Sequence, residues 1–124
     1  MIEELYCRRC NEKLSKQPLY QADVSQLREF PQRELLQDDQ YVLVSDYGSG
    51  FALPLTHLVS TVCLAFKNHP DEMRFLGCCG SGQLEQYNQV CINCSYSLGL
   101  RYDDCIGSSF TAVNMDRLSL IPVW

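Results

Sequence analysis

The sequence has no apolar run near the roughly 20 residues that a membrane-spanning helix needs, which argues against an integral membrane protein. Its first residues, MIEELYCRRC, include early acidic side chains and lack the apolar centre of a secretory leader. Low-complexity tracts and linkers are also missing. These absences predict a cytoplasmic protein that folds as a single domain over residues 1–124.

Basic residues are few compared with acidic ones. The chain has 10 Lys and Arg against 15 Asp and Glu, which gives a formal net charge of −5. Nucleic-acid binding needs Lys and Arg to displace counterions from the phosphate backbone, and no basic run is present. The charge therefore disfavours nucleic-acid binding and predicts a partner protein with a basic surface.

Histidine is scarce, whereas cysteine is abundant. Only two histidines are present and the His-Glu-x-x-His pattern of metallohydrolases is missing, which disfavours a catalytic zinc site with an open position. Eight cysteines in a reducing cytosol are more typical of metal or redox chemistry than of disulfides. A disulfide scaffold is the alternative if the protein is exported.

Two stretches share one form, CRRCNEKL at residues 7–14 and CINCSYSL at residues 91–98. In each, two cysteines three positions apart precede a small polar residue, Asn11 or Ser95, where a tight turn favours left-handed backbone. Two such turns supply the four thiolates of a tetrahedral zinc site. We therefore predict a zinc-ribbon-like structural site that joins the N-terminus to the C-terminal third, with the ligands Cys7, Cys10, Cys91 and Cys94. The alternative is two unrelated pairs, one redox-active and one structural.

The residues between the cysteine pairs predict an α+β fold with a mostly antiparallel sheet and one main helix. Strand-forming residues recur at 41–45, from Phe51 onward, in SLGLRYDD (97–104) and in SSFTAVNM (108–115), with a turn at 48–50. Apolar side chains with steps of three and one predict the helix over about residues 55–67, with Leu55, Leu58, Val59, Val62, Cys63 and Phe66 on one face. On this helix Cys63 is expected to be buried and His57 to face solvent.

The stretch GCCGSG at residues 77–82 is the least ordinary part of the remaining sequence. Its adjacent cysteines, Cys78 and Cys79, allow three interpretations: structural packing, redox chemistry or a second metal site. Because the side chains of adjacent cysteines diverge, a second site would combine one of them with Cys105 and His69. The tripeptide that starts at His69 also occurs in J-domains, but the basic helix that precedes it in J-domains is missing here.

A longer pattern runs from His69 to Cys105: HPDEMRFLGCCGSG, then NQVCINC, then DDC. It resembles a family of small uncharacterised bacterial proteins, whose pattern ends in Asp-Cys-Trp where this chain has Ile106. The matching positions are His69, Asp71, Arg74, Gly77, Cys78, Cys79, Gly80, Asn88, Cys91, Cys94, Asp104 and Cys105. The resemblance implies a bacterial protein with a metal-held fold, and it implies no activity.

Three kinds of function fit these observations. The first, which we favour, is an acidic zinc-binding protein that binds another protein stoichiometrically, as immunity proteins do when they inhibit an enzyme with a basic active site. The second is a thiol- or zinc-dependent enzyme that uses the Cys78–Cys79 loop. The third is a zinc-ribbon module that binds nucleic acid, which the net charge disfavours. A closed four-thiolate site leaves no coordination position for a substrate, which favours binding over catalysis.

Overall fold

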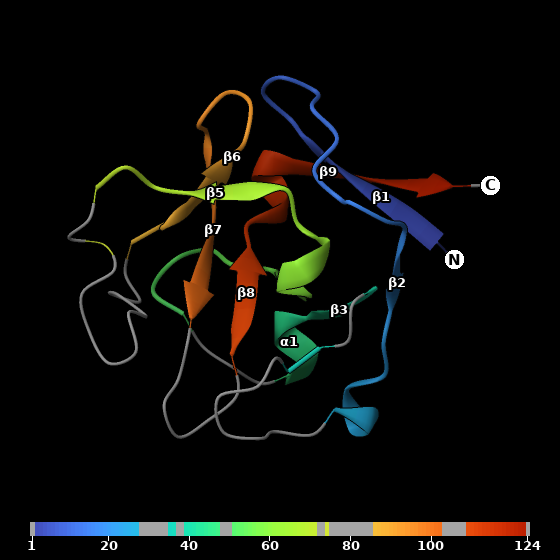
Figure 1. The fold of residues 1–124 in the computed structure, drawn as a ribbon. Coiled ribbons are helices and arrows are strands. Elements are labelled where there is room, and N and C mark those ends of the chain that lie inside the picture. Colours follow the sequence, from blue (N-terminus) through green and yellow to red (C-terminus); the bar gives the residue numbers. More distant parts are fainter. Residues whose placement is uncertain are drawn as a thin grey trace.

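The computed structural model describes residues 2–27, 35–36, 39–47, 51–71, 74, 86–102 and 109–123, and their strands form one curled sheet (Figure 1). The nine strands of this described part lie in the order β5-β6-β7-β8-β4-β3-β2-β1-β9. Neighbouring strands are antiparallel except for β2 and β3, which are parallel. The strands are β1 (Ile2–Cys7), β2 (Leu19–Gln21), β3 (Gln40–Leu43), β4 (His57–Val59), β5 (Phe66–Asn68), β6 (Gln89–Cys91), β7 (Ser97–Tyr102), β8 (Phe110–Val113) and β9 (Leu118–Val123). The helical elements are α1 (Val44–Tyr47) and the 3-10 turns η1 (Val24–Gln26), η2 (Thr61–Cys63) and η5 (Met115–Arg117).

The α+β prediction is wrong, and the helix predicted over residues 55–67 does not form. That stretch makes β4, the turn η2 and β5 instead. β4 lies between β3 and β8, and its two buried residues Leu58 and Val59 pack into different core clusters on the two faces of the sheet. Val62, expected on the apolar helix face, is 52% exposed. A strand covered on both faces has adjacent apolar residues, and periodicity over so short a run does not distinguish it from a buried helix.

Two of the other predicted strands are present. β7 and β8 occupy predicted stretches and pair with each other from Gly99↔Val113 to Tyr102↔Phe110. The strand predicted at 41–45 starts one residue earlier as β3 and gives way to α1 at Val44, and no strand begins at Phe51. The turn predicted at 48–50 lies outside the described residues.

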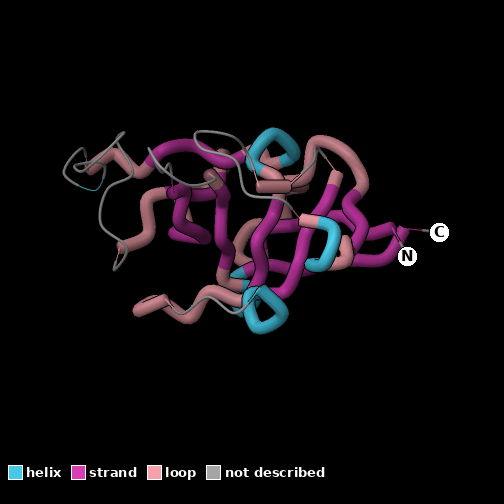
Figure 2. The backbone as a smooth tube through the Cα atoms, turned by 90° about the horizontal axis from the view of Figure 1, so that it is seen from below, coloured by secondary structure: helices cyan, strands magenta, loops and turns pink. Residues whose placement is uncertain are grey.

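The segment 13–16 closes the curl of the sheet. The N–H of Leu14 donates to the carbonyl of Leu5 in β1, and the Leu14 carbonyl accepts from the N–H of Ala65, just before β5, at 2.7 Å. The N–H of Lys16 donates to the carbonyl of Cys63 at 2.6 Å. This segment therefore links β1, the last strand but one in the order, to the chain that enters β5, the strand at the other end of the order. The strands thus surround an interior, with the short helical elements at their periphery (Figure 2).

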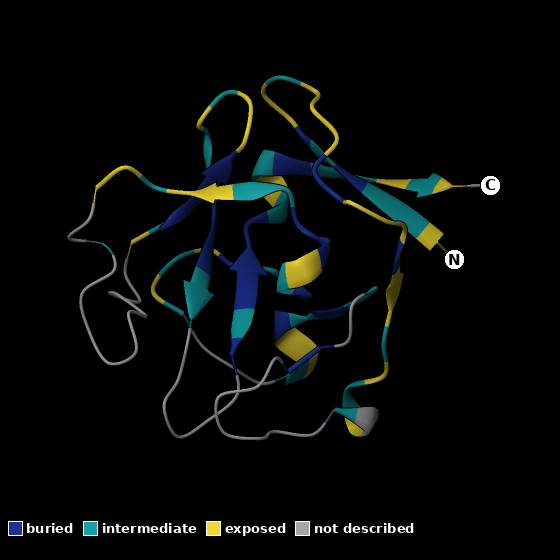
Figure 3. Cartoon of the chain, in the orientation of Figure 1, coloured by how far each residue is buried: buried dark blue, intermediate teal, exposed yellow. Residues whose placement is uncertain are grey.

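Two buried clusters fill the molecule. One contains Leu5, Leu14, Leu98 and Leu118 among its fully buried side chains and extends to the ends of β1 and β6. The other lies on the opposite face of the sheet, around Leu58 of β4. Exposed residues gather in the loops after β1 and β6 (Figure 3), so the first cluster supports two solvent-facing loops. In the described part of the chain, no helix has the length and apolar character to cross a membrane.

Candidate metal centre

The candidate metal centre lies where the loops after β1 and β6 meet. Cys7 is the last residue of β1 and Cys91 is the last residue of β6, and each is followed by a three-residue turn. In the first loop the N–H of Asn11 donates to the carbonyl of Cys7 at 2.8 Å. In the second, the N–H of Ser95 donates to the carbonyl of Cys91 at 3.0 Å. Two segments from opposite ends of the chain therefore fold into matching turns.

The residue after each second cysteine has left-handed backbone, as its sequence position predicts. The φ angle is 62° at Asn11 and 63° at Ser95, and these are the two non-glycine residues with positive φ in the described chain. Side chains make this conformation costly, and Asn tolerates it better than Ser does. Both loops adopt it because it turns the backbone back after the second cysteine. The N–H of Asn93 then lies 3.4 Å from the Cys91 sulfur as a donor.

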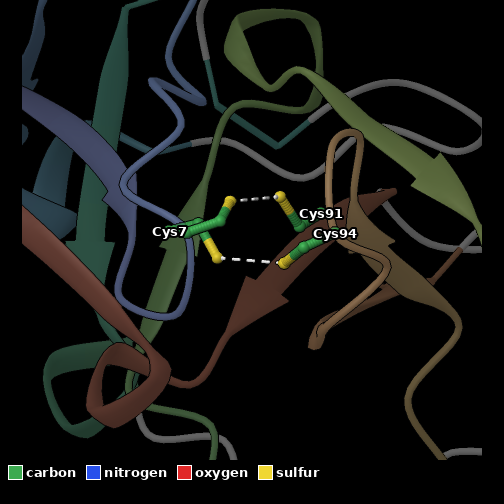
Figure 4. A group of neighbouring side chains, drawn as sticks. Cys7, Cys91 and Cys94 are labelled. Atoms are coloured by element: carbon green, nitrogen blue, oxygen red, sulfur yellow. Dashed lines mark hydrogen bonds between the residues drawn. The ribbon is translucent and has the colours of Figure 1, made fainter.

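The four cysteine sulfur atoms lie within 4.8 Å of one another and point to a common centre (Figure 4). The Cys7 and Cys94 sulfurs are 3.7 Å apart, and so are the Cys10 and Cys91 sulfurs. All four cysteines are free, since a disulfide would need a separation of about 2.05 Å. Sulfur atoms about 2.3 Å from a tetrahedral metal ion are about 3.8 Å apart. The four residues can therefore hold one metal ion.

The two loops give their cysteines different environments. Cys7 and Cys91 are fully buried in the core cluster, whereas Cys10 and Cys94 pack against its edge. Burial raises the pKa of Cys7 and raises the pKa of Cys91 to about 12. The pKa of Cys10 is lowered to about 6, and the largest cause is a hydrogen bond from the Asn93 side chain. A bound cation favours the thiolate form of the buried pair, because ligating thiols lose their protons.

Three of the four candidate ligands for a second metal site lie outside the described residues: Cys78, Cys79 and Cys105. The fourth, His69, follows β5, and its Nδ1 accepts a hydrogen bond from the N–H of Asp71 at 3.0 Å. Within the described part of the chain, the four cysteines of the two loops are the one group of three or more potential ligands near enough to share a metal. The second site stays a prediction.

Two positions of the pattern that runs from His69 to Cys105 have structural roles. Asn88 is fully buried, and its side-chain amide makes two hydrogen bonds to the backbone of β7, as a neighbouring strand would. Nδ2 donates to the Arg101 carbonyl at 3.0 Å, and Oδ1 accepts from the Arg101 N–H at 2.7 Å. Arg74 donates from Nη1 to the carbonyl of Tyr87 at 2.7 Å. Both residues hold the chain that enters β6, which ends at the second cysteine loop.

His57 and Cys63 belong to the stretch where the helix was expected. His57 is half-buried, which contradicts the predicted exposure: its Nδ1 lies 2.8 Å from the Thr56 hydroxyl and its ring centre is 5.7 Å from that of Tyr41. Burial lowers the pKa of His57. Cys63 is 1% exposed, as predicted, although it ends a 3-10 turn instead of lying on a helix.

A group of arginines beside the metal centre was missed at the sequence level. Arg8 and Arg9 from the first loop, Tyr96 from the end of the second, and Asp116 and Arg117 from η5 line a pocket of about 250 Å³. The adjacent arginines Arg8 and Arg9, between the first two cysteines, are a local sequence signal for a basic site next to the metal centre. Arg117 was not detectable, because only the fold brings η5 to the two loops.

Comparisons with protein-family models, with curated proteins and with solved structures found no match. The resemblance to small bacterial proteins therefore stays a prediction.

Proposed function

We propose that Cys7, Cys10, Cys91 and Cys94 bind one zinc ion with a structural role. The observation that supports this most directly is a pair of sulfur–sulfur distances. The sulfur of the first cysteine in each loop lies 3.7 Å from the sulfur of the second cysteine in the other loop. Four thiolates complete a tetrahedral shell, so the ion would have no open position for a substrate. Zinc suits this set because it accepts thiolates without redox chemistry, and iron is the main competitor for four sulfur ligands.

The test of the zinc proposal is metal analysis of protein purified without added metal. We expect about one equivalent of zinc in the wild type and in Cys63→Ser, which changes a buried cysteine outside the site. Cys91→Ser should lose most of the metal and unfold or aggregate, and cobalt in place of zinc should give the visible spectrum of a four-sulfur site. A folded wild-type protein with less than about half an equivalent of zinc, or with iron instead, would end the proposal.

We further propose that the zinc-joined domain works by stoichiometric binding to another protein with a basic surface, in the manner of an immunity protein or inhibitor. The closed sulfur shell supports binding over turnover. The charge distribution supports a partner with a positively charged surface. The described residues contain eight acidic and eight basic side chains, whereas the rest of the sequence contains seven acidic and two basic ones. The whole excess of −5 therefore belongs to the segments outside the described residues, and acidic groups accelerate encounter with a basic partner.

The binding proposal is tested by purifying the tagged chain from its own cells at low salt and measuring the mass of the complex. We expect a fixed-ratio complex with a basic protein, whose association rate falls as salt rises. Catalytic turnover that disappears in Cys79→Ser while zinc is retained would overturn this proposal in favour of the enzyme alternative.

A further inference from the structure

The arginine pocket beside the metal centre has a charge opposite to that of the chain as a whole. Three guanidinium groups, from Arg8, Arg9 and Arg117, line a space of about 250 Å³ together with Tyr96 and the single carboxylate of Asp116. None of the ion pairs found among the described residues involves these arginines. A pocket with three cations and one anion has the chemistry to bind a negatively charged group.

Aromatic contacts hold two of the three arginines, Arg9 and Arg117, without neutralising them. The Arg117 guanidinium lies 4.6 Å from the ring centre of Tyr87 and 5.2 Å from that of Tyr96, and it donates to the Ser97 carbonyl at 2.9 Å. Arg9 lies 5.5 Å from the centre of the same Tyr96 ring. A stacked guanidinium keeps its charge and loses less freedom when it binds an anion, because its plane is already oriented.

The backbone connects the pocket to both cysteine loops. The N–H of Arg8 donates to the carbonyl of Arg117 at 3.2 Å, so the first loop is attached to η5. Tyr96 follows Ser95, the left-handed residue after the turn of the second loop. The metal centre that joins the two loops would therefore also set the distance between Tyr96 and the arginines of the first loop.

Neutralising the zinc–thiolate centre is the competing role for these arginines, since four thiolates and one zinc ion carry a negative charge. The contacts at the sulfurs argue against it. The Cys91 sulfur accepts from the N–H of Asn93, and the hydrogen bonds at Cys10 come from the Asn93 side chain, the Glu12 backbone and neighbouring cysteines. At Cys7 the Arg9 backbone contributes a hydrogen bond, but no arginine side chain does. The side chains of Arg9 and Arg117 instead lie over the ring of Tyr96, which lines the pocket.

The pocket suits an acidic peptide better than a nucleic acid. A phosphate backbone needs a track of cations, and the described residues hold as many acidic as basic groups, with Lys13 paired to Glu4. Guanidinium groups already lie over the rings of Tyr87 and Tyr96, which reduces the ring area left for stacking with bases. The Asp116 carboxylate repels a simple anion, but it can accept a main-chain N–H from a peptide.

We propose that this pocket binds an acidic segment of a protein, with the arginines holding a side-chain carboxylate and Asp116 accepting a main-chain N–H. This proposal rests on the pocket and not on the net charge, so it is independent of the binding proposal above.

The test uses the zinc-loaded full chain and a fluorescent peptide of alternating Glu and Gly, followed by anisotropy. Arg9→Gln should weaken peptide binding about tenfold, the loss expected for one charge-assisted contact, and added salt should weaken it further. Lys67→Gln, which removes an exposed cation on β5 outside the pocket, should leave the affinity unchanged. Zinc content, measured in parallel, should be the same in all three proteins.

Four results would overturn the proposal. Equal binding by Arg9→Gln and the wild type would show that the pocket is not the site. Inorganic phosphate that competes as strongly as the peptide would indicate a simple anion site, and a single-stranded RNA that binds more tightly would indicate a nucleic-acid surface. Loss of zinc in Arg9→Gln with unchanged peptide affinity would show that the arginines balance the thiolates. A wild-type protein that binds the peptide but no basic partner would refute only the earlier binding proposal.

Discussion

Removing the metal should lower the melting temperature by an amount that follows from the position of the two loops. Cys10 and Cys91 are separated by 81 positions, so the ion closes a loop that covers most of the chain. A cross-link over about 80 residues reduces the entropy of the unfolded chain by an amount equivalent to about 4.5 kcal/mol at 25 °C. A chain of 124 residues has an unfolding entropy of about 0.26 kcal/mol per kelvin. The ratio predicts that the metal-free protein melts about 17 °C lower.

The assay is calorimetry of zinc-loaded and chelator-treated protein, with the metal content of each sample measured. The direct bond energy of the ion adds to the loop term, so the shift should not be smaller than this value. Cys63→Ser is the matched control, because it changes a buried cysteine of the same core cluster and should keep both the metal and the shift on chelation. A metal-free sample that melts within about 3 °C of the loaded one would refute the reasoning, because the ion would then not constrain the unfolded chain.

Three further changes test the fold around the centre. Gly99→Ala places a Cβ 2.5 Å from the Ala112 carbonyl oxygen, so the strands must separate, and urea unfolding should show a loss of about 1–3 kcal/mol. Ser95→Gly relieves a φ of 63° and should raise stability by up to about 1 kcal/mol with zinc content unchanged, whereas a loss would mean that the serine side chain is needed. His57 has a folded pKa below its ordinary value of 6.5, so the unfolded chain takes up the proton first. The wild type should lose stability relative to His57→Gln as pH falls below 6.5 through the folded pKa, and parallel urea titrations that show a constant difference would contradict this.

The turns around the cysteines could be predicted because their chemistry is local. A two-residue gap between cysteines and a left-handed residue after them specify the turn, and Asn11 and Ser95 both adopt it. That two such turns would meet followed from the number of thiolates a metal needs, not from any pattern in the residues between them. The strands β7 and β8 were predictable for a similar reason, since their residues favour extended backbone.

The helix error and the missed pocket both come from long-range structure. Leu58 and Val59 are adjacent apolar residues because β4 has a core cluster on each face, which a short window of sequence does not reveal. Arg117 reaches the pocket because β9 pairs with β1 along its whole length and carries η5 to the first loop. Pairing between strands so distant in sequence leaves no local signal.

The pairing of β1 with β9 also has a consequence for the order of events while the chain is being made. β1 is the first described strand to be synthesised and β9 is the last, yet all six residues of each pair with the other. At about 5–20 residues per second, Cys10 is made roughly 4–16 seconds before Cys91, which follows it by 81 positions. For that time the first loop has two thiols and no partner loop, so a metal ion captured early would have only half of its shell. The ion should therefore enter late, and oxidation of the first pair during this interval would prevent its entry.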